Sequence, residues 1–350
     1  MDFFQIVEVE NRNSNNAGIK VVSDNSVVAD KLGFKKLMIQ INTKTGSAFL
    51  KIKKQIYYYL CYRKIYNTIT DNSIVLLQHP FHHKQIAREK FLKILKNNKK
   101  VKYVCMVIDI EELRVLGYNN YYEKEFKTML EIADALIVHN IEMLQFFLKK
   151  GIPKEKIINI ESFDYLQNNN NIVEFEKSIS FAGNLEIIKC GFIGELSKIK
   201  DIKINLYGSN FNNKLLNSRN INYHGSFSPD EITKKLNKGF GLVWDGDSID
   251  TCSGNFGQYL KYNNPHKLSL YLSCGLPVVI WSQAAQARFV KKYNVGICVE
   301  SLKEAEHIIS NMSENDYKIL QNSVNKIKPL LCSGYFANKA IKQAIKLLTQ

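Results

Sequence analysis

The feature that most constrains the fold of this chain is a repeated alternation of short apolar runs with longer amphipathic stretches. In the first half, the apolar runs recur about every thirty residues, at 3–9, 36–41, 73–78, 101–108, 135–140 and 156–160. Between them, residues 83–98 and 122–134 carry apolar side chains at helical spacing. Strands separated by helices in this way predict βα units on a parallel sheet.

The same alternation starts again after a polar, asparagine-rich stretch at about 162–178. The second series of apolar runs lies at 178–183, 202–208, 221–225, 240–244, 276–281 and 295–300. Its helices carry start and stop signals: Ser228-Pro229-Asp230-Glu231 reads as a capping box, and Asn264-Pro265 opens a helix that closes at Gly275. We therefore expect an α/β fold of two tandem Rossmann-like domains that face a cleft.

The length of 350 residues also fits two domains. We predict an N-terminal Rossmann-like domain over 1–162, a linker over 163–177 and a C-terminal Rossmann-like domain over 178–330. Residues 331–350 form a final amphipathic helix that can return to the N-terminal domain.

Composition excludes several classes of protein. Seven cysteines, an odd number with no CxxC pair, argue against a disulfide framework and a zinc finger, and fit a reducing cytosol. No apolar run reaches the length of a membrane span, and the first residues do not read as a signal peptide. The net charge of +15 suits nucleic acid, anionic lipid or a phosphorylated small molecule, but lysine is spread along the whole chain, so charge alone does not choose among them.

Ligands of such folds bind at the carboxyl ends of the strands. In the second half, Gly183 and Asn184 follow the first strand and Tyr207 ends the second. A loop of about 20 residues then leads to Asn264-Pro265-His266-Lys267 at a helix N-terminus. Free backbone N–H groups and the helix dipole make such a terminus a natural phosphate site, to which Lys267 adds a charge. An ordinary tight turn at Gly183 and a core or rim tyrosine at 207 are the alternatives.

In the first half, Asn16-Ala17-Gly18-Ile19-Lys20 reads as a glycine loop after the first strand, without the GxGxxG of a dinucleotide site. Asp109, directly after an apolar run, is the best-placed carboxylate for a general base. The alternative is that it caps the following helix. There is no GxxxxGK[ST], GxSxG or HExxH motif, and no metal site is expected.

The chain resembles the two-domain GT-B glycosyltransferases. The resemblance rests on short segments in a fixed order, NAGIK, LLQHP, VIDIEELR, ADALIVHN, SFDYL, FAGNL and FGLVWDG, and on the long block CSGNFGQYLKYNNPHKLSLYLSCGLPVVIW. It is to the bacterial family that contains the glucosyltransferase of serine-rich adhesin glycosylation and the β-1,6-galactofuranosyltransferases. This resemblance implies a cytoplasmic hexosyltransferase that moves glucose or galactofuranose from a UDP-sugar to a hydroxyl of a glycan, glycolipid or glycoprotein acceptor, without a metal.

The resemblance also implies roles for individual residues. The donor nucleotide and its diphosphate would contact Gly183, Asn184, Tyr207, Asn264, His266 and Lys267. Gly18 and Lys20 would line the acceptor side. The family tends to read IHDIE where this chain has Val107-Ile108-Asp109-Ile110-Glu111, and WSQAAQARFVKKY carries no glutamate of the E-x7-E element of many retaining enzymes. The stereochemistry of transfer, the hexose, the acceptor and its linkage stay open.

Two alternative functions accompany this prediction. One is a non-catalytic nucleotide-sugar-binding subunit that activates a partner transferase. The other is a nucleic-acid binder, for which no motif is present, so no nucleic-acid partner is expected.

The basic, aromatic segment at 51–66 reads as an amphipathic helix. It either touches an anionic membrane at its inner face or packs on the sheet with its lysines in water. A monomer and a homo-oligomer are both left open.

Overall fold

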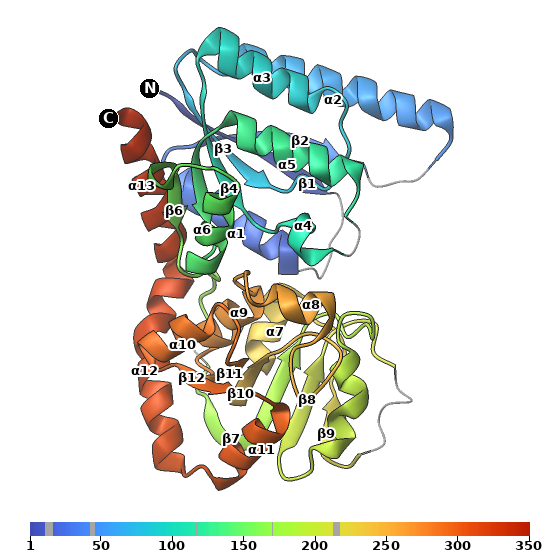
Figure 1. Ribbon diagram of the computed structural model, residues 1–350, viewed down its shortest axis with the longest axis vertical. Helices are drawn as coiled ribbons and strands as arrows, with labels where there is room; N and C mark the ends of the chain where they lie inside the picture. The colour runs from blue at the N-terminus through green and yellow to red at the C-terminus, as the bar shows by residue number, and fades with distance from the viewer. Residues whose placement is uncertain (11–16, 43–45, 116–117, 170, 213–217) are drawn as a thin grey trace.

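The computed structural model describes residues 1–10, 17–42, 46–115, 118–169, 171–212 and 218–350. These residues form two six-stranded sheets, stacked as an upper and a lower domain in Figure 1, and every described strand pair is parallel. The expected α/β class with two Rossmann-like sheets is confirmed.

The first sheet has the strand order β2-β1-β3-β4-β5-β6. Its strands are β1 (Phe3–Glu10), β2 (Lys35–Ile41), β3 (Ile74–His79), β4 (Lys102–Val107), β5 (Ala133–Val138) and β6 (Ile157–Asn159). Its helices are α1 (Ala17–Lys31), α2 (Ala48–Thr68), α3 (Arg88–Lys99), α4 (Glu111–Arg114), α5 (Asn120–Ile132) and α6 (Ile141–Lys149).

Side chains of β3 show how this sheet is buried on both faces. Ile74 and Leu76 join the apolar cluster that includes Val28 of α1, whereas Val75 and Leu77 join a second cluster that contains residues of α2 and α3. Successive strand residues point to opposite faces, so a nearly continuous apolar strand is what a sheet covered on both sides requires.

The second sheet has the order β12-β11-β10-β7-β8-β9. Its strands are β7 (Glu174–Ala182), β8 (Lys203–Tyr207), β9 (Ile221–Tyr223), β10 (Lys238–Val243), β11 (Val278–Trp281) and β12 (Gly296–Val299). Its helices are α7 (Pro229–Lys235), α8 (Gly254–Tyr259), α9 (His266–Cys274), α10 (Ala287–Tyr293) and α11 (Leu302–Asn311), with 3-10 turns at Gly191–Lys198 here and at Lys154–Lys156 in the first domain. The capping box at α7 is confirmed, because the Ser228 side chain accepts from the Glu231 amide and the Glu231 carboxylate accepts from the Ser228 amide.

Two expected boundaries differ from the structure. Strand β7 begins at Glu174, inside the stretch expected to be linker, because Glu174 pairs with Lys238 of β10 and its amide donates to Asn237 O. The expected glycine loop at 16–20 is wrong from residue 17 onward, because α1 begins at Ala17. Val21 and Val28 of this helix are buried against the sheet. The apolar face to which they belong favours a helix over a loop in this segment. Residue 16 lies outside the described residues.

Two long helices connect the domains (Figure 1). Helix α12 (Glu314–Ser333) packs on α9 and β7 of the second domain, and α13 (Tyr335–Thr349) packs on β4, β5 and β6 of the first. Between them Gly334 has φ +84°, and a Cβ there would lie 2.4 Å from Val28 Cγ2. The turn therefore needs glycine both for its backbone and for its close approach to α1.

The segment between the domains is tied to the start of α13. Asp164 is buried, and its two carboxylate oxygens accept from the amides of Phe336 and Ala337 at 3.2 and 2.7 Å. These are N–H groups of the first turn, which have no partner inside the helix. Asp164 thus fixes the returning helix to the connection between the sheets.

Within the described residues, no helix has both the length and the apolar character needed to cross a membrane.

Candidate functional site

The carboxyl ends of the two sheets face each other, and direct contacts join them. Tyr259 of α8 donates its hydroxyl to Asp109 Oδ1 at 3.2 Å, and the same hydroxyl accepts from the Ile110 amide at 2.9 Å. On a neighbouring strand, His139 Nδ1 accepts from the Asn264 amide at 2.9 Å. Loops after β4 and β5 therefore meet the long loop after β10, as expected for a cleft between two such domains.

Lys267, in the first turn of α9, forms a nearly buried ion pair. Its Nζ lies 2.7 Å from Asp245 Oδ1, and the two side chains are only 12% and 11% exposed. The ammonium also lies 4.6 Å from the centre of the Phe181 ring. Burial disfavours the charged ammonium, but the Asp245 carboxylate outweighs this effect and holds the pKa of Lys267 above its usual value. Lys267 is thus a permanent cation at the positive end of a helix.

The backbone of Gly183 lies directly beside the Lys267 side chain. A Cβ built on Gly183 would lie 3.1 Å from Lys267 Cε, which is tighter than most side-chain contacts. The backbone at the end of β7 can therefore come close to the lysine, or to a ligand bound there, only because residue 183 has no side chain.

Asn184 and Tyr207 lie beside Gly183 at the ends of β7 and β8. Asn184 Oδ1 accepts from the side-chain amide of Asn210 at 2.9 Å. Tyr207 stacks on His224, with ring centres 4.7 Å apart and an interplanar angle of 12°. Tyr207 O accepts from the Gly183 amide, which joins the two strand ends. The structure thus brings Gly183, Asn184 and Tyr207 together at the carboxyl ends of two neighbouring strands of the second sheet.

Asn264 is buried and holds the two domains together. Its side-chain amide donates to His139 O and Glu161 O, and its Oδ1 accepts from Asn140 and from Gln286. All the hydrogen-bonding groups of this side chain are therefore used within the protein. Asn264 fixes the loop that leads into α9.

His266 opens α9 and is held in the same way. Its Nε2 lies 3.1 Å from Asp164 O, and its ring stacks on Tyr165 with centres 5.0 Å apart. Burial lowers the pKa of His266 to about 4, so the ring is neutral at pH 7. Asn264 and His266 thus anchor the start of the helix that carries Lys267.

On the first domain, Asp109 follows β4 and lies where the two domains meet, in contact with Tyr259. Besides Tyr259, it lies 3.4 Å from Arg114 Nη1. Helix α4 has Ile110 as its N-cap and shows no side-chain capping bond, so the alternative role of Asp109 as a helix cap is wrong. Asp109 is partly exposed, as a group that exchanges protons with a bound molecule must be.

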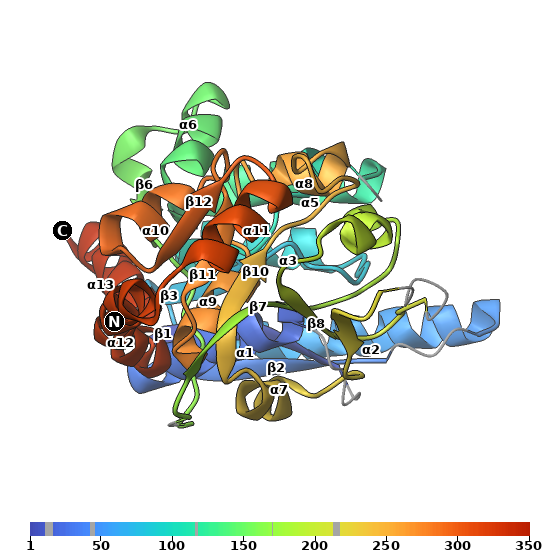
Figure 2. The same ribbon diagram turned by 90° about the horizontal axis from the view of Figure 1, so that it is seen from below.

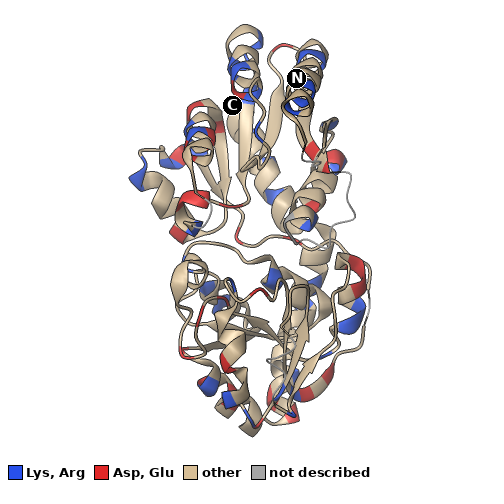
Figure 3. Cartoon of the chain, turned by 90° about the vertical axis from the view of Figure 1, so that its right-hand side faces the viewer, with Lys and Arg blue, Asp and Glu red and all other residues tan. Residues whose placement is uncertain are grey.

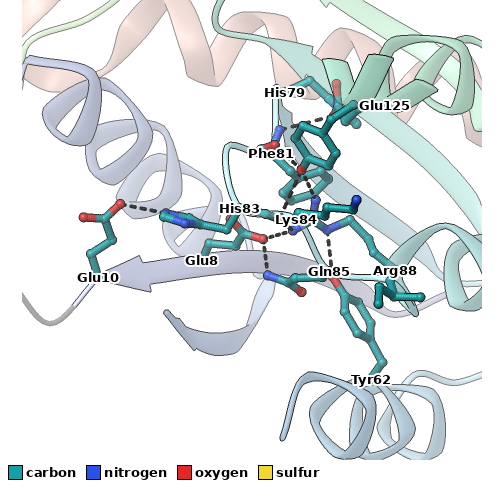
Figure 4. A network of polar contacts seen from close by, with 12 residues as sticks. Glu8, Glu10, Tyr62, His79, Phe81, His83, Lys84, Gln85, Arg88 and Glu125 are labelled. Atoms are coloured by element: carbon teal, nitrogen blue, oxygen red, sulfur yellow. Dashed lines mark hydrogen bonds and ion pairs between the residues drawn. The ribbon is translucent and has the colours of Figure 1, made fainter. Parts of the chain in front are cut away.

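A small cavity opens beside Asp109 and has room for a group the size of a water or a hydroxyl. His79, Pro80, Tyr122 and Glu125 also line it. His79 Nδ1 lies 2.5 Å from Glu125 Oε1 (Figure 4). Burial opposes the charge on Glu125, but His79, the Phe81 amide and Arg88 outweigh it, so the pKa of Glu125 lies below its usual value. The other ring nitrogen, His79 Nε2, is buried and has no hydrogen-bond partner among the described residues.

The residues expected on the acceptor side lie in the first turn of α1. Lys20 Nζ lies 2.6 Å from Asp24 Oδ1 and donates to Leu166 O at 2.8 Å, and it lies 4.9 Å from the centre of the Tyr165 ring. Gly18 lies on the same turn. The structure therefore places Lys20 against the connection between the domains.

Three functional features escaped the sequence reasoning. Asp245 pairs with Lys267 across the long loop after β10, a contact that a single sequence does not reveal. Tyr259 reaches Asp109 from another domain, which a single sequence does not reveal. The His79–Glu125 pair joins two residues 46 positions apart; the only sequence signal for it is a polar residue at the end of strand β3.

Two parallel-sheet domains with facing carboxyl ends, joined by a crossing C-terminal helix pair, are the arrangement of GT-B glycosyltransferases. The solved structure of HepE from Anabaena, in complex with UDP and glucose, superposes with a TM-score of 0.60 over 99% of both chains. The two sequences are 11% identical, so this likeness concerns the fold alone.

Sequence comparison identifies the family. The model "Glucosyltransferase 3-like, N-terminal domain" matches residues 4–162, and "Glucosyltransferase 3-like, C-terminal domain" matches residues 179–344. The β-1,6-galactofuranosyltransferase WbbI of Escherichia coli K12 is 36% identical over 70% of this chain and 72% of its own length. Glucosyltransferase 3 of Streptococcus gordonii is 27% identical over 73% of this chain and 72% of its own length. The chain belongs to the glucosyltransferase 3-like family and is a glycosyltransferase, which confirms the expected family and enzyme class.

Proposed function

We propose that the chain transfers a hexose, glucose or galactofuranose, from a UDP-sugar to a hydroxyl of a glycan, glycolipid or glycoprotein acceptor in surface polysaccharide or glycoprotein biosynthesis. The E. coli and S. gordonii relatives are named for transfer of these two hexoses. The observation that carries the proposal is the buried Lys267 cation at the N-terminus of α9, directly beside Gly183.

The donor half of the proposal follows from the charge of the leaving group. When the bond between the sugar and UDP breaks, negative charge develops on the diphosphate. The free N–H groups of the first turn of α9 and the Lys267 ammonium stabilise such charge. In this arrangement the diphosphate shares Lys267 with Asp245, and no metal ion is required.

The other predicted donor residues take two different roles. Gly183, Asn184 and Tyr207 line the strand ends at which the nucleotide would bind. The ring of Tyr207 is held in place by stacking on His224. Asn264 and His266 act through α9: their contacts with His139 and Asp164 hold its first turn in place. Because the Asn264 side chain and the Nε2 of His266 already have partners in the protein, we assign both residues to positioning of Lys267.

The acceptor half rests on Asp109 and its neighbouring cavity. We propose that the cavity receives the acceptor hydroxyl and that Asp109 removes its proton as the hydroxyl attacks the sugar. His79 is the second candidate for this proton, because it lines the same cavity and its Nε2 is buried with no hydrogen-bond partner in the described part of the chain. Gly18 and Lys20 would support the acceptor side, Lys20 by holding α1 to the connection between the domains.

This division assigns the acceptor to the domain of residues 1–162 and the donor to the domain of residues 178–330, across the connecting segment, with α13 returning to the first. A cytoplasmic location at the inner face of the membrane belongs to the same proposal, since a glycolipid acceptor lies at such a surface.

The test is calorimetric titration of the full chain with UDP, UDP-glucose and UDP-galactofuranose in the presence of EDTA, followed by detection of UDP released from each sugar nucleotide. We expect binding of UDP and of one sugar nucleotide, and slow release of UDP by transfer to water. Absence of binding by all three ligands would overturn the donor assignment. Binding without any UDP release, even with added acceptors, would favour a non-catalytic subunit.

A further inference from the structure

Tyr259 of the second domain reaches across to the first domain and hydrogen-bonds the Asp109 carboxylate. It is the last residue of α8 and is only 4% exposed. Helix α8 packs on α4 of the first domain, and Figures 1 and 2 both show it where the second domain meets the first. Figure 3 shows this junction from the side, with acidic and basic segments near it in both domains. A buried contact across such a junction relates the geometry of one domain to that of the other.

The two hydrogen bonds of the Tyr259 hydroxyl fix the direction of its proton. The hydroxyl accepts from the Ile110 amide at 2.9 Å, and a backbone amide donates but does not accept. The single hydroxyl hydrogen is therefore directed to Asp109 Oδ1, which lies at 3.2 Å. Burial, and after it the Asp109 carboxylate, raises the pKa of Tyr259 well above its ordinary value of 10, so this hydrogen is present at neutral pH.

The second oxygen of the Asp109 carboxylate is held less closely. Arg114 Nη1 lies 3.4 Å from Asp109 Oδ2 but 2.6 Å from Glu111 Oε1, so this guanidinium is engaged mainly by Glu111. The rotation of the Asp109 carboxylate is thus set chiefly by Tyr259. An ionised carboxylate has about four lone-pair sites, so lone pairs remain for a further hydroxyl after these two contacts are made.

Helix α8 also rests on the backbone of the proposed donor site. A Cβ built on Gly257 would lie 2.4 Å from the carbonyl carbon of Cys252 and 3.0 Å from Asp245 O, so the helix packs directly on these two residues. The Asp245 carboxylate in turn holds Lys267 at 2.7 Å. The helix that carries Tyr259 therefore contacts the residue that holds the proposed diphosphate lysine.

We propose that Tyr259 is a positioning residue for sugar transfer, whose hydroxyl holds the Asp109 carboxylate in the orientation that takes the proton of the acceptor hydroxyl. This inference rests on the proposed role of Asp109 as the base. As the acceptor oxygen forms its bond to the sugar, the proton passes to a lone pair of Asp109, and the bond between the sugar and UDP breaks with its electron pair on the diphosphate. Because Tyr259 belongs to the donor domain, the base is oriented relative to the sugar that this domain binds.

The test compares Tyr259→Phe, Asp109→Asn and the double variant in the full chain. Phenylalanine keeps the packing of the ring and removes only the hydroxyl. UDP release to water is measured with UDP-glucose or UDP-galactofuranose, whichever the wild type turns over faster. We expect Tyr259→Phe to lower kcat by roughly tenfold, a part of the contribution of a general base, with the KM of the sugar nucleotide and the Kd of UDP unchanged. In Asp109→Asn the same substitution should cause no further loss, because no carboxylate is left to position.

The matched control is Tyr317→Phe on α12, which removes another buried hydroxyl, one that donates to Gly239 O at 2.7 Å. It should keep the wild-type kcat and KM, and circular dichroism melting verifies the folding of every variant. A Tyr259→Phe enzyme as fast as this control would overturn the inference. So would a loss that appears in KM rather than in kcat, or two losses that multiply in the double variant. Wild-type activity of Asp109→Asn would overturn the base assignment itself, and the inference with it.

Discussion

Lys267 Nζ and Asp245 Oδ1 lie 2.7 Å apart and connect the end of β10 to the first turn of α9. The pair places a buried cation beside Gly183, where the helix dipole also favours negative charge. At the same time, Asp245 neutralises that cation as long as no ligand is bound. In the proposed donor site, an incoming diphosphate would therefore meet a lysine that is already ionised and held in position.

Removal of the Lys267 ammonium tests its role in catalysis. We expect Lys267→Ala to lower the rate of UDP release by roughly 10²-fold or more, comparable with removal of one preorganised donor in other enzymes. The rate is measured at saturating sugar nucleotide, with folding checked by circular dichroism. The exposed Lys234→Ala on α7 is the control and should retain wild-type activity. A Lys267→Ala enzyme with a near-wild-type rate would refute the assignment.

Removal of the Asp245 carboxylate should destabilise the free protein. In Asp245→Asn the ammonium loses its ion partner in a nearly buried place, so we expect the free energy of unfolding to fall by about 3 kcal/mol. Saturating UDP should then raise the melting temperature more in the variant than in the wild type, because the diphosphate supplies the missing charge. Asp250→Asn, at an exposed position with only a distant lysine partner, should behave like the wild type. Equal UDP shifts in both proteins would show that the diphosphate binds elsewhere.

The fold could be predicted almost entirely from the sequence. Every expected strand is present. The central strands leave the strongest signal because they are buried on both faces of a parallel sheet, as Ile74, Val75, Leu76 and Leu77 are. The start of β7 was placed four residues late because its first residues, beginning at Glu174, are polar and partly exposed at the end of the sheet.

The candidate site was only partly predictable. The N-terminus of α9 was visible because Pro265 and Gly275 mark the ends of a helix in the sequence. The internal roles of Asn264 and His266 were not, because their partners His139 and Asp164 lie more than 100 residues away. A single sequence shows that a residue is polar, but it does not show whether that polarity faces a ligand or another part of the chain.

Two variants distinguish the candidate bases. If Asp109 takes the proton of the acceptor hydroxyl, Asp109→Asn should lower the rate of UDP release by roughly 10²-fold, the contribution typical of a general base, and His79→Gln should have a smaller effect. UDP affinity, measured by calorimetry, should stay unchanged in both variants because both residues lie on the first domain.

The reverse order of the two rate losses would transfer the role to His79, whose ring is oriented by Glu125. Glu123→Gln, at an exposed position on the same helix as Glu125, is the control and should leave the rate unchanged. A loss of UDP affinity in Asp109→Asn would show instead that this carboxylate shapes the donor site through Tyr259.

The buried His139 should make the stability of the protein depend on pH. Its Nε2 donates to Val107 O at 3.0 Å, and its Nδ1 accepts from the Asn264 amide. The second bond requires the neutral ring, because a protonated Nδ1 cannot accept. Burial lowers the pKa of His139 to about 4, whereas the unfolded chain has the ordinary value of 6.5. Between these values the unfolded state binds the proton and the native state does not. Stability is therefore fully present above pH 6.5 and falls as the pH drops toward 4, by ~3 kcal/mol for this one residue.

Urea unfolding across this range should give a shallower decline of stability for His139→Gln than for the wild type. The decline that remains in the variant is owed in part to His266. The exposed His307→Gln should keep the wild-type slope, and an equally steep decline in His139→Gln would contradict the assignment.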